Sequence, residues 1–327
     1  MGTKKLTAQQ YTVGWISPLE IEQTVALLMV DEEHERLPQA AEDPTVYHLG
    51  RIGHHNVVIA GLPNTGNTSA ASMVTHMRRS FPNLRFGILV GIGGGVPGPR
   101  EKKEDIRLGD VVVSEPSGSH SGAVQYDRGK AEAWEFVRTG YLTPPPLALL
   151  NAARTLSVKR TLCQTDPIKR HLKKIDTTRR QLRQYQYPGI GQDILHSASC
   201  IPDKAMQGCE CTRSHGLTIQ DTQSLHDILD RDQSKEEAFI TIHRGTIASG
   251  EMVIKNGLLR DYLAKQHDVY CFETEAAGAL NDFPCLVIRG ISDYCDAYKN
   301  NSWDGYAAAV AAAYARELFD HMPINIA

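Results

Sequence analysis

Acidic side chains follow several apolar segments of the chain, at positions where strands are expected to end. Glu273 and Glu275 in FETEAAG are two residues apart, so they would lie on the same side of an extended segment. Carboxylates placed in this way are suited to accept hydrogen bonds from the paired hydroxyl groups of a ribose. The alternative is the acidic first turn of a solvated helix, which the helix dipole favours.

Asp293 stands directly after the apolar segment CLVIRGI, in the motif ISDYCD. Partial burial raises the pKa of a carboxyl group, so an aspartate at such a position is a candidate general acid. An N-cap of the next helix is the alternative. Glu20 and Glu22 follow the first expected strand in the same way, in ISPLEIE. Because ligands of open α/β sheets bind where strands end, we expect these groups to meet.

A glycine cluster, VGIGGGVP at residues 90–97, follows another apolar segment. Gly93 and Gly94 would let backbone amides approach a ligand closely, although a tight turn is the more common reason for such a run. The spacing matches neither G-x-G-x-x-G on a helix nor a P-loop, so it predicts no nicotinamide or ATPase site. We expect no cofactor.

Strands and helices are expected to alternate along the chain. Strand-like segments lie at residues 11–16, 47–52, 56–62, 86–90, 110–114, 239–243, 269–272 and 285–291. Helical patterns lie between several of them and at 306–319, which is rich in alanine. This order predicts a three-layer α/β/α fold with a central mixed, largely parallel twisted sheet.

Composition excludes several classes of protein. Of 327 residues, 41% are hydrophobic and 22% charged, with a net charge of -3, which favours neither a nucleic-acid coat nor a membrane surface. Apolar stretches are shorter than the roughly 20 residues of a membrane span, and MGTKKLTAQQ lacks the apolar core of a secretory signal. Seven scattered cysteines predict reduced thiols and a cytoplasmic protein.

Residues 154–237 differ in character and are interpreted as a basic insertion in a single domain that spans residues 1–327. Between Arg154 and Arg183 lie ten Lys/Arg residues and two acids, which predicts solvated or partner-facing helices rather than a nucleic-acid site, since aromatic residues are few. Cys200, Cys209, Cys211 and His215 could hold zinc, but the spacing lacks paired C-x2-C motifs. No metal site is predicted.

Several motifs together resemble those of the purine nucleoside phosphorylase and methylthioadenosine/S-adenosylhomocysteine (MTA/SAH) nucleosidase superfamily. In chain order they are TVGWISPLEIE, LPNTGNTSAA, LVGIGGGVP, RLGDVVVSEP, GTIASGEMV, FETEAAG and IRGISD. The pattern GWxxxLxIE, with VGIGGGVP, LGDVVVS, QYPG and DFPCLVIRG, is most similar to a fungal branch. In that branch such a domain often heads multidomain receptor-like proteins.

The resemblance implies a role for each matching residue. Asp293 corresponds to the acid that protonates N7 of the leaving purine, and Glu22 to the carboxylate that activates water. Glu275 corresponds to the carboxylate that binds the ribose hydroxyls and steadies the oxocarbenium-like transition state. Further substrate contacts are implied in four motifs. They are Thr65 and Gly66 in LPNTGNTSAA, Gly93 and Gly94 in the glycine cluster, Glu273 in FETEAAG, and Ser249 and Val253 in GTIASGEMV, the segment that lies against the base in the family.

Two departures from the family pattern bear on the reaction. Thr274 stands where methionine is common, so the wall beside the sugar is expected to differ. Leu89 and Ile92 stand where phosphorolytic relatives have an arginine and a serine or threonine for phosphate. An apolar pair cannot form charge-assisted hydrogen bonds with phosphate, so we expect water as the nucleophile. The resemblance also implies a homo-oligomer.

The expected substrate is a purine nucleoside or nucleotide of the adenosine/ATP class. Some receptor-linked relatives are immune effectors that remove adenine from ATP. Basic groups that could contact a phosphate chain are Arg100, Lys102, Lys103, His54 and His55, although ordinary solvation is the commoner role of such groups. A phosphate-dependent phosphorylase and a non-catalytic ligand-sensing module remain the alternative functions.

Overall fold

A central sheet forms the middle of the computed structural model, which describes residues 4–98, 105–202 and 239–324. Ten strands of these residues make up the sheet. Nine follow one another in the order β11 (Val269–Glu273), β10 (Ile242–Ser249), β6 (Val111–Ser114), β12 (Cys285–Asp293), β5 (Phe86–Gly95), β1 (Val13–Ser17), β4 (His55–Gly61), β3 (Tyr47–Ile52) and β2 (Glu32–Glu33). The tenth, β7 (Ala123–Gln125), pairs with β10.

The sheet is mixed and largely parallel, as the alternation of elements predicts. Neighbours from β4 through β1 and β5 to β12 are parallel, and so are β6, β10 and β11. The β6–β12 pair and the predicted β3–β4 hairpin are antiparallel. Gly94 and Gly95 of β5 also pair with Phe272 and Cys271 of β11. This extra pairing brings the ends of two strands that carry expected site residues side by side.

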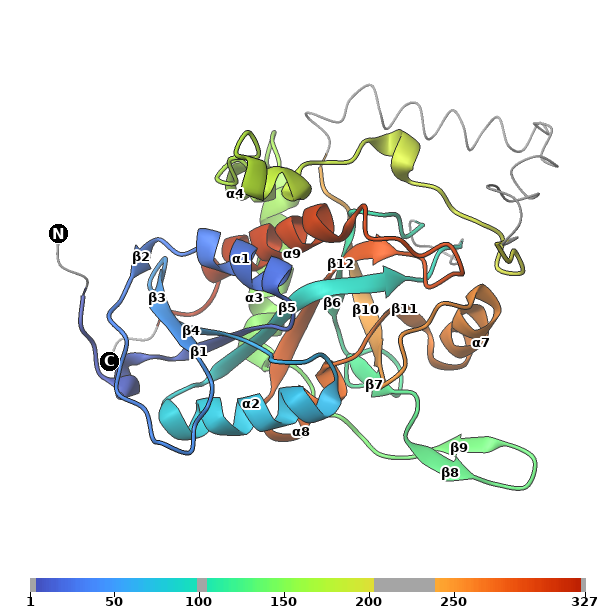
Figure 1. The fold of residues 1–327 in the computed structure, drawn as a ribbon, viewed down its shortest axis with the longest axis horizontal. Helices are drawn as coiled ribbons and strands as arrows, with labels where there is room; N and C mark the ends of the chain where they lie inside the picture. Colours follow the sequence, from blue (N-terminus) through green and yellow to red (C-terminus); the bar gives the residue numbers. More distant parts are fainter. Residues whose placement is uncertain (1–3, 99–104, 203–238, 325–327) are drawn as a thin grey trace.

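Helices cover both faces of the sheet (Figure 1). One face is covered by α1 (Glu20–Leu28), α3 (Leu147–Leu162) and α9 (Asp304–Phe319), and the other by α2 (Asn67–Ser80) and α8 (Ala276–Asp282). Successive side chains of a strand point to opposite faces, so Leu286 and Ile288 of β12 pack under α9 while Val287 joins the core under α2 and α8. The predicted three-layer α/β/α architecture is confirmed.

Smaller elements complete the fold. α7 (Gly257–His267) packs beside β11, and the hairpin of β8 (Gly129–Ala131) and β9 (Phe136–Arg138) projects from the body of the molecule (Figure 1). Short 3-10 turns are η1 (Ala8–Gln10), η2 (Arg180–Tyr185) and η3 (Ile190–Gln192). Within the described residues, no helix is long and apolar enough to cross a membrane.

The glycine cluster differs from the expected loop, because β5 continues to Gly95. A Cβ added at Gly95 would lie 2.8 Å from Cγ2 of Ile291 and 3.0 Å from Cγ2 of Ile106. Contacts this short leave no room for a side chain. The glycines therefore allow close packing of a strand and do not form a turn.

The basic segment forms helices as expected, but they are not solvated on all sides. Leu149 and Leu156 of α3 are buried in the core under α9, and Leu182 and Tyr185 of η2 join them. A further short helix, α4 (Pro167–Leu172), packs against α9. The described part of the segment thus buries Leu156, Ile168, Ile175 and Leu182, whereas Val158, Leu162 and most of the basic side chains are exposed.

The cysteines only partly follow the expectation of reduced thiols. Cys163, Cys271, Cys285 and Cys295 are free, whereas Cys200 is disulfide-bonded, so the expectation is wrong at that residue. The other members of the proposed zinc group, Cys209, Cys211 and His215, lie outside the described residues.

Candidate active site

A cavity of about 220 Å³ lies where β5, β11 and β12 end and where α1 begins. Its apolar wall includes Met252, Val253, Ile254 and Phe272. Its charged side chains come from α1, from the ends of β11 and β12 and from the segment leading into α9, and they are Glu22, Glu273, Glu275, Arg289, Asp293, Lys299 and Asp304. Glu22, Glu273, Glu275 and Asp293 therefore meet at one edge of the sheet, whereas Glu20, which the sequence singled out with them, is exposed and lines a separate hollow.

Glu22 is held in the first turn of α1 by backbone amides. Its Oε2 accepts a hydrogen bond from Leu19 N at 2.7 Å, and its Oε1 accepts one from Ile92 N, also at 2.7 Å. The residue is only 3% exposed. Burial raises the pKa of Glu22 to about 7, although the nearby charge of Arg289 and the two amides oppose the rise. This carboxyl group is therefore poised to exchange a proton near neutral pH.

Arg289 lies in β12 beside two carboxylates, one at the last residue of β11 and one just before α8. Its Nη2 donates to Glu273 Oε2 and, at 3.2 Å, to Glu275 Oε2, while Nη1 donates to Ile92 O at 3.2 Å. Burial by itself would lower the pKa of Arg289, but Glu273, Glu275 and Glu22 raise it above its ordinary value. We call these four residues the arginine cluster.

The two glutamates of the motif FETEAAG have different surroundings. Glu273 accepts hydrogen bonds from the amides of Glu275 at 3.1 Å and Ala276 at 3.0 Å, so it caps the first turn of α8. Glu275 Oε1 accepts from Gly66 N at 3.1 Å and from Thr274 Oγ1 at 2.5 Å. The helix-start alternative thus describes Glu273 well, whereas Glu275 ties the cavity to the loop before α2.

Asp293 is the last residue of β12 and pairs with a lysine that the sequence did not single out. Lys299 Nζ donates to Asp293 Oδ2, and Asp293 is only 5% exposed. Burial disfavours the charge of Lys299, but Asp293 outweighs that effect and the pKa of Lys299 is raised. Asp304 at the start of α9 faces the same ammonium, and its pKa is raised by burial although Lys299 opposes the rise. We call Asp293, Lys299 and Asp304 the lysine cluster.

Two glycines of β5 give these carboxylates room. A Cβ added at Gly91 would lie 2.4 Å from Glu22 Oε1 and 2.5 Å from Arg289 Nη1. One added at Gly94 would lie 2.1 Å from Cys295 Sγ and 2.8 Å from Asp293 Oδ1. Any side chain at either position would displace a charged group of the site.

Comparisons with solved structures show where this architecture occurs. The futalosine hydrolase of Helicobacter pylori superimposes with a TM-score of 0.60 at 15% identity, over 96% of this chain and 99% of the hydrolase. The MTA/SAH nucleosidase of the same organism superimposes with a TM-score of 0.59 at 15% identity, over 98% and 100%. This chain has the MTA/SAH nucleosidase fold. The resemblance expected from the motifs is confirmed at the level of the fold.

Curated relatives with sequence similarity are longer than this chain. A nucleotide-binding leucine-rich repeat (NLR)-like protein of the fungus Hyaloscypha variabilis is 40% identical over 316 residues, 96% of this chain and 29% of its own length. The ATP nucleosidase Cap17 of Escherichia coli is 23% identical over 270 residues, 81% of this chain and 41% of its own length. The chain thus spans less than half of either relative. No family model matches the chain.

Most of the residues that the sequence pointed to come together within this nucleosidase fold. Those that line the cavity are Glu22, Thr65, Gly93, Gly94, Val253, Glu273, Glu275 and Asp293. Gly66 contributes through its amide to Glu275. Ser249 is fully buried outside the lining, and its hydroxyl accepts from Ala277 N at 2.8 Å. We therefore assign Ser249 to holding α8 in place.

The structure describes only two of the five expected phosphate-chain contacts. Arg100, Lys102 and Lys103 lie outside the described residues. His54 and His55 form the turn of the β3–β4 hairpin at the start of β4, whereas the cavity lies beyond the ends of the parallel strands. The two histidines are therefore not placed to contact a ligand in the cavity, and His55 instead packs against Phe319.

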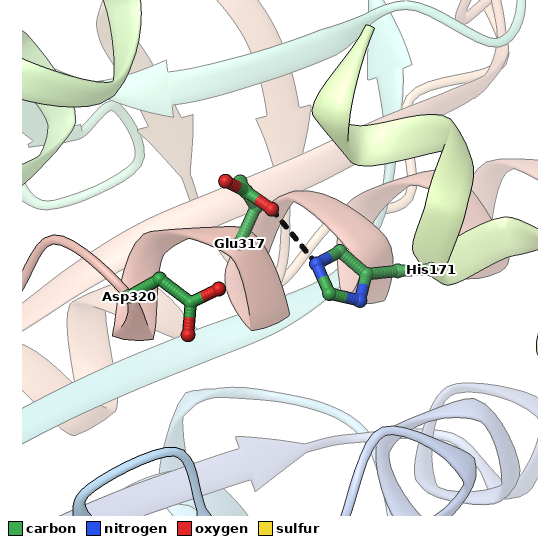
Figure 2. Close-up of side chains that lie close together, drawn as sticks. All are labelled: His171, Glu317 and Asp320. Carbon is green, nitrogen blue, oxygen red and sulfur yellow. Dashed lines mark hydrogen bonds and ion pairs between the residues drawn. The ribbon is translucent and has the colours of Figure 1, made fainter. Parts of the chain in front are cut away.

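A second group of titratable side chains, His171, Glu317 and Asp320, lies far from the cavity and close enough together to hold a cation (Figure 2). His171 Nε2 and Glu317 Oε2 are 2.8 Å apart. Arg170 Nη2 donates to Glu317 and to Asp320 at 2.7 Å each, and Arg316 donates to Asp320 at 2.9 Å. Guanidinium groups already balance these carboxylates, so the group joins α4 to the end of α9.

Proposed function

We propose that this chain is a purine N-glycosidase that hydrolyses the bond between a purine base and its ribose. The observation that carries the proposal is the convergence of Glu22, Glu275 and Asp293 on one cavity. Cleavage of an N-glycosidic bond requires a group that activates water, negative charge beside the oxocarbenium-like sugar and an acid for the leaving base. The three carboxylates would supply these in that order.

Glu22 is suited to activate water because it is buried and its pKa is raised to about 7. Near neutral pH a large share of Glu22 is ionised and ready to accept a proton. Glu275 is held rigidly by Gly66, Thr274 and Arg289, so its charge is preorganised beside the sugar. Asp293, across the cavity at the end of β12, would protonate N7 of the purine.

Water is favoured over phosphate as the nucleophile by the contacts of Ile92. The amide of Ile92 faces the cavity from the glycine cluster, but it already donates to Glu22. A phosphate ion at this place would meet the Glu22 carboxylate, the amide of Ile92 is already engaged, and Leu89 is fully buried away from the cavity. Electrostatic repulsion therefore disfavours phosphate.

The proposed substrate is an adenine nucleoside or nucleotide. The relative named ATP nucleosidase Cap17 supports the nucleotide form. Contacts of Arg100, Lys102 and Lys103 with a phosphate chain remain part of the hypothesis. If charge reversal of Lys102 and Lys103 leaves activity on ATP unchanged, those two contacts are excluded.

Liquid chromatography of base release tests the proposal directly. The protein is incubated with adenosine, guanosine, AMP and ATP, each with and without inorganic phosphate, beside Asp293→Asn. We expect free base without phosphate, with about a 10³-fold lower rate in the variant because a general acid contributes about 10²–10⁴. Base that appears only with phosphate would identify a phosphorylase. No base from any substrate would favour a non-catalytic ligand-sensing module.

A further inference from the structure

Lys299 occupies a position between two cavities. It follows β12 in the loop before α9, and its side chain is 22% exposed. Together with Ser292 and Asp293 it lines both the substrate cavity and a second cavity of about 140 Å³. The second cavity is polar, with Gln192 and Asn300 in its wall, and it is large enough for several water molecules.

Three donors surround the carboxylate of Asp293. Cys295 N donates to Oδ1 at 2.8 Å, and Ser292 Oγ donates to Oδ2 at 3.1 Å. The ammonium of Lys299 also donates to Oδ2. All three contacts are ones that an ionised carboxylate accepts. Of these three donors the ammonium of Lys299 is the strongest acid, because the other two are a neutral hydroxyl and a backbone amide.

We infer that Lys299 supplies, through Asp293, the proton that the leaving purine takes up. The inference rests on the proposed glycosidase function. As the C1′–N9 bond breaks, its electron pair moves to the purine, and Asp293 passes a proton to N7 while it receives one from Lys299 Nζ. Asp293 begins and ends as a carboxylate, and Lys299 becomes a neutral amine. The water that attacks C1′ gives its proton to Glu22, which then releases it to solvent, and Lys299 regains a proton from solvent through the second cavity, so that no net proton is gained or lost.

The charges around Lys299 suit this role. Asp293 of β12 and Asp304 of α9 face its ammonium, as does the thiol of Cys295, while Arg260 of α7 is held by Tyr294 O at 2.7 Å. The two acids keep Lys299 protonated across the neutral range, since its pKa is raised. Lys299 thus acts through Asp293: it positions the carboxylate and supplies the proton that Asp293 passes on.

The dependence of kcat on pH separates proton supply from a structural role. In the full chain, Lys299→Met is compared with Lys299→Arg, which keeps the charge but releases no proton in this range. We expect the native kcat to hold as pH rises from 7 to 9. In both variants it should fall, by about tenfold for each pH unit, because the proton must then come from hydronium in the solvent, whose concentration falls tenfold per pH unit. KM should change little by comparison.

A substrate whose leaving group needs no proton provides a second test. With 4-nitrophenyl β-D-ribofuranoside we expect both Lys299 variants to match the native rate within about twofold, because only steps that require proton transfer are slowed. Lys159→Met, an exposed lysine on α3, is the control for loss of a lysine. Rescue by Lys299→Arg, or an equal fall in kcat at every pH, would overturn the inference. If the native chain releases no base at all, the proposed function fails instead.

Discussion

The cavity has two charged sides that hold their carboxylates in different ways. In the arginine cluster one guanidinium pairs with Glu273 and Glu275, while Glu22, buried beside them, accepts hydrogen bonds from two backbone amides. In the lysine cluster an ammonium pairs directly with Asp293 beside a second polar cavity. The buried arginine cluster fixes geometry and leaves one acid poised near neutral pH, whereas the lysine cluster also borders a second cavity. Under the proposed function, the two halves of the reaction would fall to the two sides of one pocket.

Arg289→Met should have the largest effect, because it removes the cation on which the arginine cluster depends. Breaking a buried ion pair from one side costs about 3–5 kcal/mol of unfolding free energy, and activity should be lost. Urea unfolding measures the change. Arg51→Met is the matched control, since its pair with Glu32 is exposed and is worth about 1 kcal/mol at most. If Arg289→Met loses no more unfolding free energy than Arg51→Met, the ion pairs of the arginine cluster do not behave as buried ion pairs.

Glu22→Gln should lower kcat/KM by about 10³-fold, as expected for loss of a general base. The kcat/KM of the native protein should rise with pH up to about 7 and then level off, because Glu22 must lose its proton to act and its pKa is about 7. The variant should lack this rise. Initial rates of base release between pH 5 and 9 measure both. A rise that persists in the variant would assign the titration to another group.

Gly94→Ala should displace the carboxyl group of Asp293 without removing it. The added Cβ would lie 2.8 Å from Asp293 Oδ1, and misplacement of a reacting group by about 1 Å can cost about 10²-fold in rate. Gly191→Ala is the control, because a Cβ there meets nothing within 4 Å. Equal activity of the two variants would show that the close approach of β5 to Asp293 has no role in the reaction.

His54→Ala should have the smallest effect. His54 lies in the β3–β4 turn, at the end of the strands away from the cavity. Activity on ATP should stay within about twofold, because surface substitutions away from a site change free energies by about 0.5 kcal/mol at most. A larger loss, specific to ATP over adenosine, would mean that the phosphate chain reaches this hairpin.

Local pattern was sufficient to predict most of the central strands and the carboxylates at their ends, but the strand expected at 239–243 lies at Ile242–Ser249, and β2, β7, β8 and β9 were not expected. An apolar run followed by an acid, as in CLVIRGISD, predicts both β12 and the position of Asp293, because burial and the end of a strand are local properties. Arg289 was missed although its signal is present. A lone arginine inside that apolar run must be buried, and a buried guanidinium requires carboxylate partners.

Other contacts have no local signal at all. Lys299 lies in the polar segment AYKNNS, where a solvated lysine is the ordinary expectation. The bond from Ile92 N to Glu22 joins residues 70 positions apart. Such pairings depend on how β1, β5 and β12 are aligned, which hydrophobic periodicity does not determine. The histidines were misplaced for the same reason, since a hairpin turn can lie at either end of a parallel sheet.

The burial of β12 has a consequence for how activity is lost. All nine residues of this strand are buried, and it carries Arg289 and Asp293 between β5 and β6. Backbone amides in such a strand exchange with solvent deuterium only when the whole domain opens. The acid and the central guanidinium therefore cannot fray away from the pocket one at a time. Enzymatic activity should persist nearly unchanged up to the cooperative unfolding transition and disappear together with it.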